Sequence, residues 1–284
     1  MLYMEENQIV TMTDSYIIVT GASGSMGKAA CRNLVRKGEK VIMACRSVEK
    51  AEKAREEILA GEGLGDACLE IKPLDLCSFA SVRAFASALG DTKVKALFNN
   101  AGTMPRRYGL TSDGYERACQ VNFLSPLLLS ALLKGNLTPE AQIVNMVSLT
   151  CRLVGTDTLL TERGGKDYGQ LSTYARTKRA LLLCGLEFSA RSGIRVNFSD
   201  PGIVNSSMIS LDRWFDPLAD VLFRPFCKSP EKGVQSALLA LNYNGSGKLF
   251  TSSGMKDLPR SYSRDKDKAA LLLDKAMECA GFSL

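Results

Sequence analysis

Short apolar runs alternate with amphipathic stretches along most of the chain. The runs have the length and apolar content of strands buried on both faces, and they cover Tyr16–Thr20, Val41–Ala44, Cys68–Lys72, Val94–Phe98, Gln142–Val147, Arg195–Phe198 and Lys248–Thr251. Helical patterns lie between them at Met26–Arg36, Val48–Leu59, Ser78–Leu89, Tyr115–Leu133 and Tyr174–Arg191. Another helix opens at Ser229, with serine as N-cap and proline in the first turn. This alternation predicts βαβ units and right-handed crossovers.

The predicted fold class is α/β, a doubly wound parallel sheet of about seven strands with helices on both faces. The length of 284 residues allows one domain or two. No internal repeat or linker interrupts the pattern, so we expect one domain over residues 15–284. Residues 1–14 lack the apolar core of a signal peptide and are expected to form a flexible leader.

Charge and composition narrow the possible partners. The net charge is +6, but the basic residues are scattered, which indicates solubility and a slight preference for anionic ligands rather than nucleic-acid binding. The most apolar stretch, Phe123–Leu133, is too short to span a membrane and contains Pro126. We therefore expect no transmembrane segment and no nucleic-acid partner.

The chain contains no histidine. This absence excludes Ser-His-Asp and Cys-His triads and every zinc site that uses histidine, and no metal is expected. The nine cysteines form no CxxC pair, and their odd number suits a reducing compartment, so a cytoplasmic location is expected. Acid/base chemistry must then use tyrosine, lysine, carboxylates or cysteine.

A glycine-rich turn, Thr20–Gly27, follows the first predicted strand and opens a helix. Glycines allow a tight turn and a close approach of the backbone to a pyrophosphate, and a helix N-terminus offers free N–H groups. Glycines also occur in ordinary strand-to-helix turns. Because the turn comes first in an alternating β/α chain, we interpret it as a dinucleotide site.

The end of the second predicted strand indicates which dinucleotide binds. An acidic residue there would bind the ribose 2′-hydroxyl of NAD, whereas this chain has Arg46 followed by Ser47. An arginine can form charge-assisted hydrogen bonds to a 2′-phosphate, although it could also be a solvated surface charge. The sequence favours NADP, with NAD as the alternative.

Tyr174 and Lys178 lie four residues apart and share one face of a predicted helix. An ammonium group near a phenol favours the phenolate and lowers its pKa, so the pair could exchange a proton with a substrate oxygen. Chance produces the same spacing on many helices. Ser148 follows the fifth strand, where ligands of open sheets bind, although it could be a loop serine or a helix cap.

Together and in this order, these motifs resemble the short-chain dehydrogenase/reductase family, whose fold is a single Rossmann domain. The resemblance runs from Ser15 to the last helix and adds the family's Asn99–Gly102 and Pro201–Gly202 motifs. It implies a catalytic tetrad of Asn122, Ser148, Tyr174 and Lys178. It also implies cofactor contacts at Gly21, Ser23, Gly24, Ser25, Met26, Gly27, Arg46, Ser47, Asp75, Leu76, Asn100, Ala101, Gly102, Tyr174, Lys178, Pro201, Gly202 and Val204.

The resemblance assigns roles to these residues. Tyr174 would act as the acid/base, Lys178 would bind the nicotinamide ribose and lower the tyrosine pKa, and Ser148 would bind the substrate carbonyl. Asn122 would hold a water of the proton relay, and Asp75 would lie beside the adenine. Family members are often homodimers or homotetramers, so a homo-oligomer is expected.

Several segments resemble the retinol dehydrogenase branch, namely Val41–Ser47, the long Ser148–Tyr174 insert and Arg213–Pro230. That branch generally uses NADP and often acts on lipophilic carbonyls or alcohols. Two positions depart from the family pattern: Ser25 stands where the compact pattern has its middle glycine, and Ser206 stands near the usual threonine.

The segment at about 205–228 is apolar and aromatic and falls where the family has a substrate lid. It contains Trp214, Phe215, Leu218, Val221, Leu222, Phe223 and Phe226. Such a stripe also fits an interface or a core helix. The expected function is NADP(H)-dependent interconversion of a carbonyl and an alcohol on a fairly apolar small molecule. The alternatives are a non-catalytic dinucleotide-binding sensor or scaffold and a C=C reductase.

Overall fold

The computed structural model describes residues 14–62, 68–155, 160, 168–204, 228–258 and 265–284. Nearly all of the predicted leader and of the predicted lid therefore lies outside the described residues. Each of the seven predicted strands is present in the described part, and an eighth follows them.

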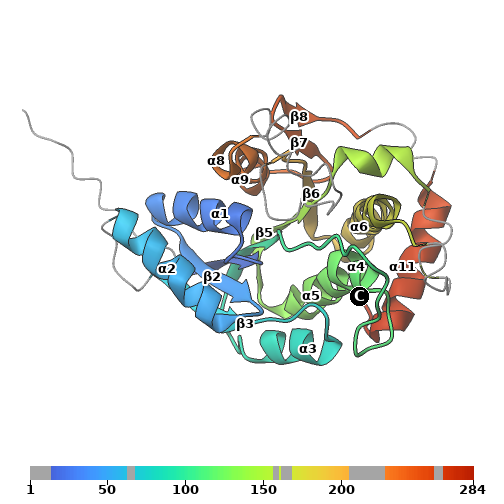
Figure 1. Ribbon diagram of the computed structural model, residues 1–284, viewed down its shortest axis with the longest axis horizontal. Coiled ribbons are helices and arrows are strands. Elements are labelled where there is room, and N and C mark those ends of the chain that lie inside the picture. Colours follow the sequence, from blue (N-terminus) through green and yellow to red (C-terminus); the bar gives the residue numbers. More distant parts are fainter. Residues whose placement is uncertain (1–13, 63–67, 156–159, 161–167, 205–227, 259–264) are drawn as a thin grey trace, which may run out of the picture.

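One sheet forms the centre of the molecule (Figure 1). Its strands are β1 Tyr16–Thr20, β2 Lys40–Cys45, β3 Leu69–Pro73, β4 Val94–Asn99, β5 Leu137–Met146, β6 Arg195–Ser199, β7 Leu249–Thr251 and β8 Gly254–Lys256. They pair in the order β3-β2-β1-β4-β5-β6-β7-β8, and all pairs are parallel except the antiparallel β7–β8 pair. The fold class is the predicted one, with a short extra strand at one edge.

Helices cover both faces of this sheet. Figure 1 shows α1 Ser25–Arg36, α2 Val48–Glu62, α8 Pro230–Gly233 and α9 Gln235–Leu241 on one side. The other side carries α3 Phe79–Ser87, α4 Arg117–Cys119, α5 Ser125–Leu132, α6 Gln170–Ser192 and α11 Lys266–Ala280. Two short 3₁₀ helices, η3 Leu133–Gly135 and η4 Leu149–Leu153, flank β5. Within the described ranges, no helix is both long and apolar enough to cross a bilayer.

Alternate residues of the central strands fill two separate cores, as the period of two along a strand requires. In β1, Ile18 joins the core beneath α3, α5, α6 and α11, whereas Ile17 and Val19 join the core beneath α1, α2 and α9. All three side chains are buried. Burial on both faces explains why the strand reads as a continuous apolar run.

The strand order reverses at β1, which has β2 on one side and β4 on the other. The chain leaves β1 through α1 on one face and reaches β4 through α3 on the opposite face. A reversal of this kind opens a crevice at the carboxyl ends of β1 and β4, where open α/β sheets bind ligands.

The helix predicted over Tyr115–Leu133 is broken in the structure. A π-helical turn, η2 Gln120–Leu124, separates α4 from α5, and all of its residues are buried. Single π turns inside helices are frequent at functional sites. This turn contains Asn122, one of the predicted catalytic residues.

Candidate active site

The glycine-rich turn lies between β1 and α1 and is tightly packed. Gly21 has a φ of 63°, and its N–H donates to the Ala44 carbonyl at 2.8 Å. A Cβ on Gly27 would lie 2.4 Å from the Gly21 carbonyl oxygen, so a side chain is excluded there. Gly24 is the N-cap of α1 and has no side chain to bind the N–H groups of the first turn. These N–H groups are therefore available to a ligand.

The departure at Ser25 does not disturb this turn. Ser25 is the first residue of α1, and the close backbone approach falls on Gly27 and Gly21 instead. The backbone cradle that a pyrophosphate needs is therefore present with the glycine spacing of this chain.

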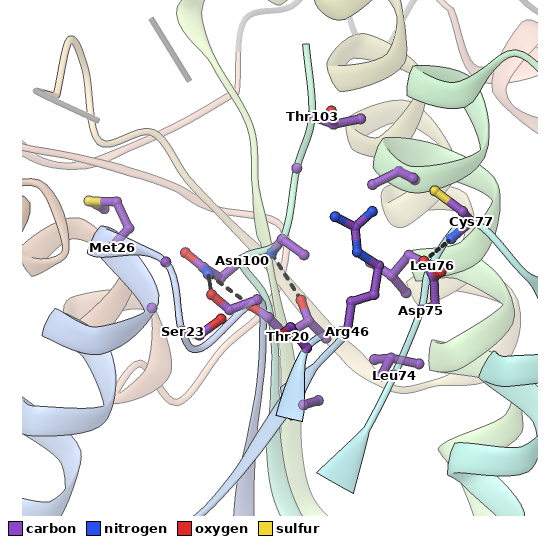
Figure 2. A pocket seen from close by; sticks show the side chains of 18 of the residues that line it. Thr20, Ser23, Met26, Arg46, Leu74, Asp75, Leu76, Cys77, Asn100 and Thr103 are labelled. Carbon is purple, nitrogen blue, oxygen red and sulfur yellow. Dashed lines mark hydrogen bonds between the residues drawn. The ribbon is translucent and has the colours of Figure 1, made fainter. Parts of the chain in front are cut away.

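A pocket of about 400 Å³ lies at the carboxyl ends of β1, β2 and β4. Figure 2 shows Ser23 and Met26 on one side, the Leu74–Cys77 segment on the other, and Arg46 between them. The pocket brings together thirteen of the predicted cofactor residues: Gly21, Ser23, Gly24, Ser25, Met26, Gly27, Arg46, Ser47, Asp75, Leu76, Asn100, Ala101 and Gly102. The predicted residues outside its lining are Tyr174, Lys178, Pro201, Gly202 and Val204.

Nine further lining residues were not among the individually predicted cofactor contacts, although Thr20 opens the predicted glycine-rich turn. They are Thr20, Ala44, Lys50, Leu74, Cys77, Thr103, Arg117, Val121 and Met146. Arg117 opens α4 and Val121 lies in the π turn that follows it, and both line the pocket. The pocket thus has three basic residues, Lys50, Arg46 and Arg117, which suit a phosphate-bearing ligand.

The Asn99–Gly102 motif joins the ends of neighbouring strands. The Asn100 side chain donates to the Thr20 carbonyl at 2.8 Å, and the Ala101 N–H donates to the Thr20 hydroxyl at 3.0 Å. Asn99 is buried and donates to the Asn145 side chain at 2.8 Å. The motif therefore joins the ends of β1 and β4, and these ends form one wall of the pocket.

Tyr174 and Lys178 lie in the first half of α6, which begins at Gln170 rather than at Tyr174. Lys178 is buried, and its Nζ donates to the Met146 carbonyl at 2.8 Å and lies 5.8 Å from the centre of the Tyr174 ring. Met146 ends β5 and lines the pocket. Lys178 is thus held against the end of β5, with the Tyr174 ring beside it.

The pKa of Tyr174 is raised in this structure rather than lowered. Burial, with smaller contributions from Asp200 and Cys151, raises the pKa of Tyr174 to about 12. Burial also lowers the pKa of Lys178 to about 8, and its ammonium is bound to a backbone carbonyl. The phenol is therefore protonated near neutral pH.

Ser148 is the N-cap of η4, two residues beyond β5. Its Oγ accepts hydrogen bonds from the Thr150 hydroxyl at 3.0 Å and the Thr150 N–H at 3.4 Å. Because the Ser148 hydroxyl accepts in both contacts, its own proton remains available. Ser148 can therefore cap η4 and also donate to a substrate oxygen.

Asn122 lies in the π turn, and its side chain is bound to protein groups. Its Oδ1 accepts from the Thr103 N–H at 2.7 Å, and its Nδ2 donates to the Thr103 carbonyl at 2.8 Å and to the Thr177 hydroxyl at 3.1 Å. The Thr177 hydroxyl in turn donates to the Tyr174 carbonyl at 2.7 Å. Asn122 therefore connects the pocket wall to the turn of α6 that carries Tyr174.

The Pro201–Gly202 motif follows β6, and Gly202 has a φ of 73°. Val204 pairs with Lys228, and Val204 and Met26 both lie against Gly233 of α8, where an added Cβ would meet them at 2.6 and 3.0 Å. Two predicted cofactor residues that are distant in sequence thus meet beside the glycine-rich turn. Ser206 lies outside the described residues.

A model of the short chain dehydrogenase family matches residues 15–213 of the chain. Retinol dehydrogenase 12 of Mus musculus is 34% identical over 283 residues, covering 96% of this chain and 88% of the relative. Retinol dehydrogenase 11 of Homo sapiens is 34% identical over 260 residues, covering 84% and 80%.

Solved structures share the fold. An uncharacterized protein from Mycobacterium paratuberculosis is 25% identical, with a TM-score of 0.76 and 96% of each chain covered. An NADPH-bound carbonyl reductase from chicken fatty liver is 21% identical, with a TM-score of 0.61, covering 87% of this chain and 100% of that one. With the family match, the motif order and the relatives, the chain belongs to the short-chain dehydrogenase/reductase family of oxidoreductases, in its retinol dehydrogenase-like branch.

Proposed function

We propose that the chain is an NADP(H)-dependent oxidoreductase that interconverts a carbonyl and an alcohol on a fairly apolar small molecule. The observation that carries the proposal is the hydrogen bond from Lys178, which lies beside the Tyr174 ring, to the Met146 carbonyl at the end of β5, a residue that also lines the pocket. The retinol dehydrogenases among its relatives and the NADPH-bound carbonyl reductase of the same fold support it.

The pocket residues fit the dinucleotide. The free N–H groups at the start of α1 would bind the pyrophosphate, and Arg46, with Lys50 and Arg117 nearby, would bind a 2′-phosphate. When bound, the nicotinamide gives or takes the hydride.

The protein then handles the proton. In reduction, the Tyr174 Oη–H donates its proton to the carbonyl oxygen, and its raised pKa keeps that proton available at neutral pH. Ser148 donates a hydrogen bond to the same oxygen. Lys178, oriented by the Met146 carbonyl, binds the ribose, and Asn122 positions α6.

Apolar side chains near the site favour an apolar substrate. Leu149 and Ile203 directly follow Ser148 and Gly202 in the chain, and they are 48% and 69% exposed. Leu153, at the end of η4, is 82% exposed. We expect Leu149 and Ile203, which adjoin the proposed site in the chain, to contact an apolar substrate.

The test measures NADPH oxidation with a panel of aldehydes, ketones and steroids. Because Tyr174→Phe removes the proton donor, we expect it to lower turnover by about 10²- to 10⁴-fold while NADPH affinity stays unchanged. Tyr243→Phe is the matched control, since Tyr243 packs on Phe250 on the opposite face of the sheet.

The possible outcomes separate the alternatives. Activity at the wild-type level in Tyr174→Phe would contradict the mechanism. Tight NADPH binding without turnover of any carbonyl would instead support a sensor or scaffold. Product analysis that shows a reduced C=C bond would identify a C=C reductase.

A further inference from the structure

Thr177 is a fully buried residue of α6 that the proposed mechanism does not use. It lies three residues after Tyr174 and directly before Lys178. Its hydroxyl donates to the Tyr174 carbonyl at 2.7 Å, and the same oxygen accepts from the Asn122 Nδ2 at 3.1 Å. A hydroxyl has one proton to give and can also accept, so both bonds can exist together. Thr177 therefore joins the turn of α6 that carries Tyr174 to a group outside the helix.

Asn122, the partner of Thr177, is also fully buried and is itself held in place. Its Oδ1 accepts from the Thr103 N–H at 2.7 Å, and its Nδ2 donates to the Thr103 carbonyl at 2.8 Å. Together with the bond to Thr177, these contacts use both protons of Nδ2. The amide side chain therefore cannot rotate without breaking several buried hydrogen bonds, each of which is costly to leave unmade.

The backbone segment 103–105 also holds the beginning of α6. The Gln170 side chain donates to the Met104 carbonyl at 3.0 Å, and Gln170 is the first residue of the helix. Tyr174 follows Gln170 by four residues and precedes Thr177 by three, so all three residues share one helix face. The helix is thus tied to this segment on both sides of Tyr174.

Thr103 is part of the wall of the dinucleotide pocket (Figure 2). One end of the chain of hydrogen bonds is therefore this wall, and the other end is the backbone of Tyr174. A displacement of about 1 Å in a reacting group can slow a reaction by about 10²-fold, so the distance between the wall and the tyrosine matters for catalysis.

We propose that Thr177 is a positioning residue whose hydroxyl, held by Asn122, sets the distance between Tyr174 and the dinucleotide pocket. The inference rests on the proposed function, because it concerns the proton donor of that reaction. Thr177 is buried and is not part of the pocket lining, so it acts through the backbone of Tyr174. Loss of its hydroxyl breaks the connection and leaves this turn of α6 free to shift.

Thr177→Val tests the proposal, because valine has nearly the shape of threonine but no hydroxyl. Stopped-flow single-turnover experiments follow the oxidation of NADPH, with the protein in excess and a carbonyl substrate from the panel. We expect the rate constant to fall by about 10- to 100-fold, because the proton donor is displaced, while the Kd of NADPH stays unchanged. A purely structural role would instead lower the amplitude, since fewer molecules would be folded, and leave the rate constant as it is.

Three further variants isolate the hydroxyl. Thr177→Ser and Thr177→Ala both lose the methyl group and differ only in the hydroxyl, so only the serine variant should keep a rate constant near that of the parent. This pair carries the test if Thr177→Val fails to fold. Ser192→Ala is the matched control, because Ser192 donates to the Phe188 carbonyl and accepts from the Ile194 N–H at the last residue of α6. We expect it to react at the parent rate.

A double-mutant cycle tests the connection to Asn122. Since Thr177 and Asn122 act in one chain of hydrogen bonds, the loss of rate in the combined Asn122→Ala and Thr177→Val variant should be smaller than the product of the two single losses. Independent, fully multiplicative losses would show that Asn122 does not hold Thr177 for catalysis and would overturn the proposal.

A parent-like rate constant in folded Thr177→Val, or equal rate constants in the serine and alanine variants, would also overturn the Thr177 proposal alone, provided that Tyr174→Phe is inactive. An active Tyr174→Phe would overturn the proposed function itself. The two failures are therefore distinguishable.

Discussion

Arg46 is the first residue after β2, and it lines the dinucleotide pocket from an exposed position. Lys50 and Arg117 line the same pocket, so the positive charge does not depend on one side chain. Of these three residues, only Arg46 directly follows β2, and the residue at this position distinguishes NADP from NAD.

We expect Arg46→Ala to weaken NADPH binding by about 10- to 100-fold, because it removes charge-assisted hydrogen bonds worth about 1.5–3 kcal/mol. NADH affinity should change little, since NADH has no 2′-phosphate. Calorimetric titration of both dinucleotides measures the two affinities. Lys134→Ala, an exposed lysine in η3 that precedes β5, is the control. Equal losses for NADPH and NADH would contradict this assignment.

At the level of single residues, the sequence identified side chains that stand out by their spacing or by their position at the end of a strand. Tyr174, Lys178 and Ser148 emerged from spacing and strand ends, and the structure places the first two together. The burial of Asp200, which immediately precedes the Pro201–Gly202 motif, was not predicted. Its N–H donates to the Phe250 carbonyl of β7, a neighbour distant in sequence that no local pattern reveals.

Among the elements, the glycine-rich turn sets how closely α1 approaches β1. A Cβ at residue 27 would lie 2.4 Å from the Gly21 oxygen and 2.6 Å from the Ala22 Cα, and both are backbone atoms that cannot rotate away. Gly27→Ala should therefore destabilise the protein by about 1–3 kcal/mol and weaken dinucleotide binding.

Gly135→Ala is the matched control for that change. Its added Cβ would meet nothing within 4 Å, so we expect a change within about 0.5 kcal/mol. Urea unfolding monitored by circular dichroism measures both variants. Equal stabilities would show that α1 shifts without cost and would refute the close-packing argument.

Apolar periodicity predicted the core strands and most helices but not the details around the site. The π turn at Asn122 depends on hydrogen bonds to Thr103 and Thr177, which are distant in sequence. β8 has three residues, two of them exposed, and gives no apolar run. β5 begins at Leu137, ahead of the predicted Gln142, because pairing with Val94 extends it through a polar segment.

At the scale of the whole molecule, the burial of Lys178 in the site lowers the stability of the folded protein. The pKa of Lys178 is lowered from 10.5 to about 8 by burial, so the folded protein holds a charge that the unfolded chain would hold more easily. At about 1.4 kcal/mol per pKa unit the penalty is about 3 kcal/mol. It is full below pH 8 and disappears as the pH rises to 10.5, because the unfolded chain then loses the same proton.

We expect Lys178→Met to be inactive but about 1–2 kcal/mol more stable near pH 7, after allowing for the Met146 carbonyl that loses its donor. The gain should shrink between pH 8 and 10.5. Chemical denaturation at a series of pH values measures it, with Lys134→Met as the exposed control. A variant less stable than the parent at pH 7 would contradict the penalty.

The two outermost strands have a consequence for how copies of this chain can associate. β3 ends at Pro73, which has no N–H to donate, and carries Lys72; at the opposite rim β8 is three residues long and ends at Lys256. Proline, lysine and short length at a rim all discourage a strand of another molecule from adding on. Self-association should therefore use the helical layers, and continuous cross-molecule ladders, the first step toward fibrous aggregation, are disfavoured.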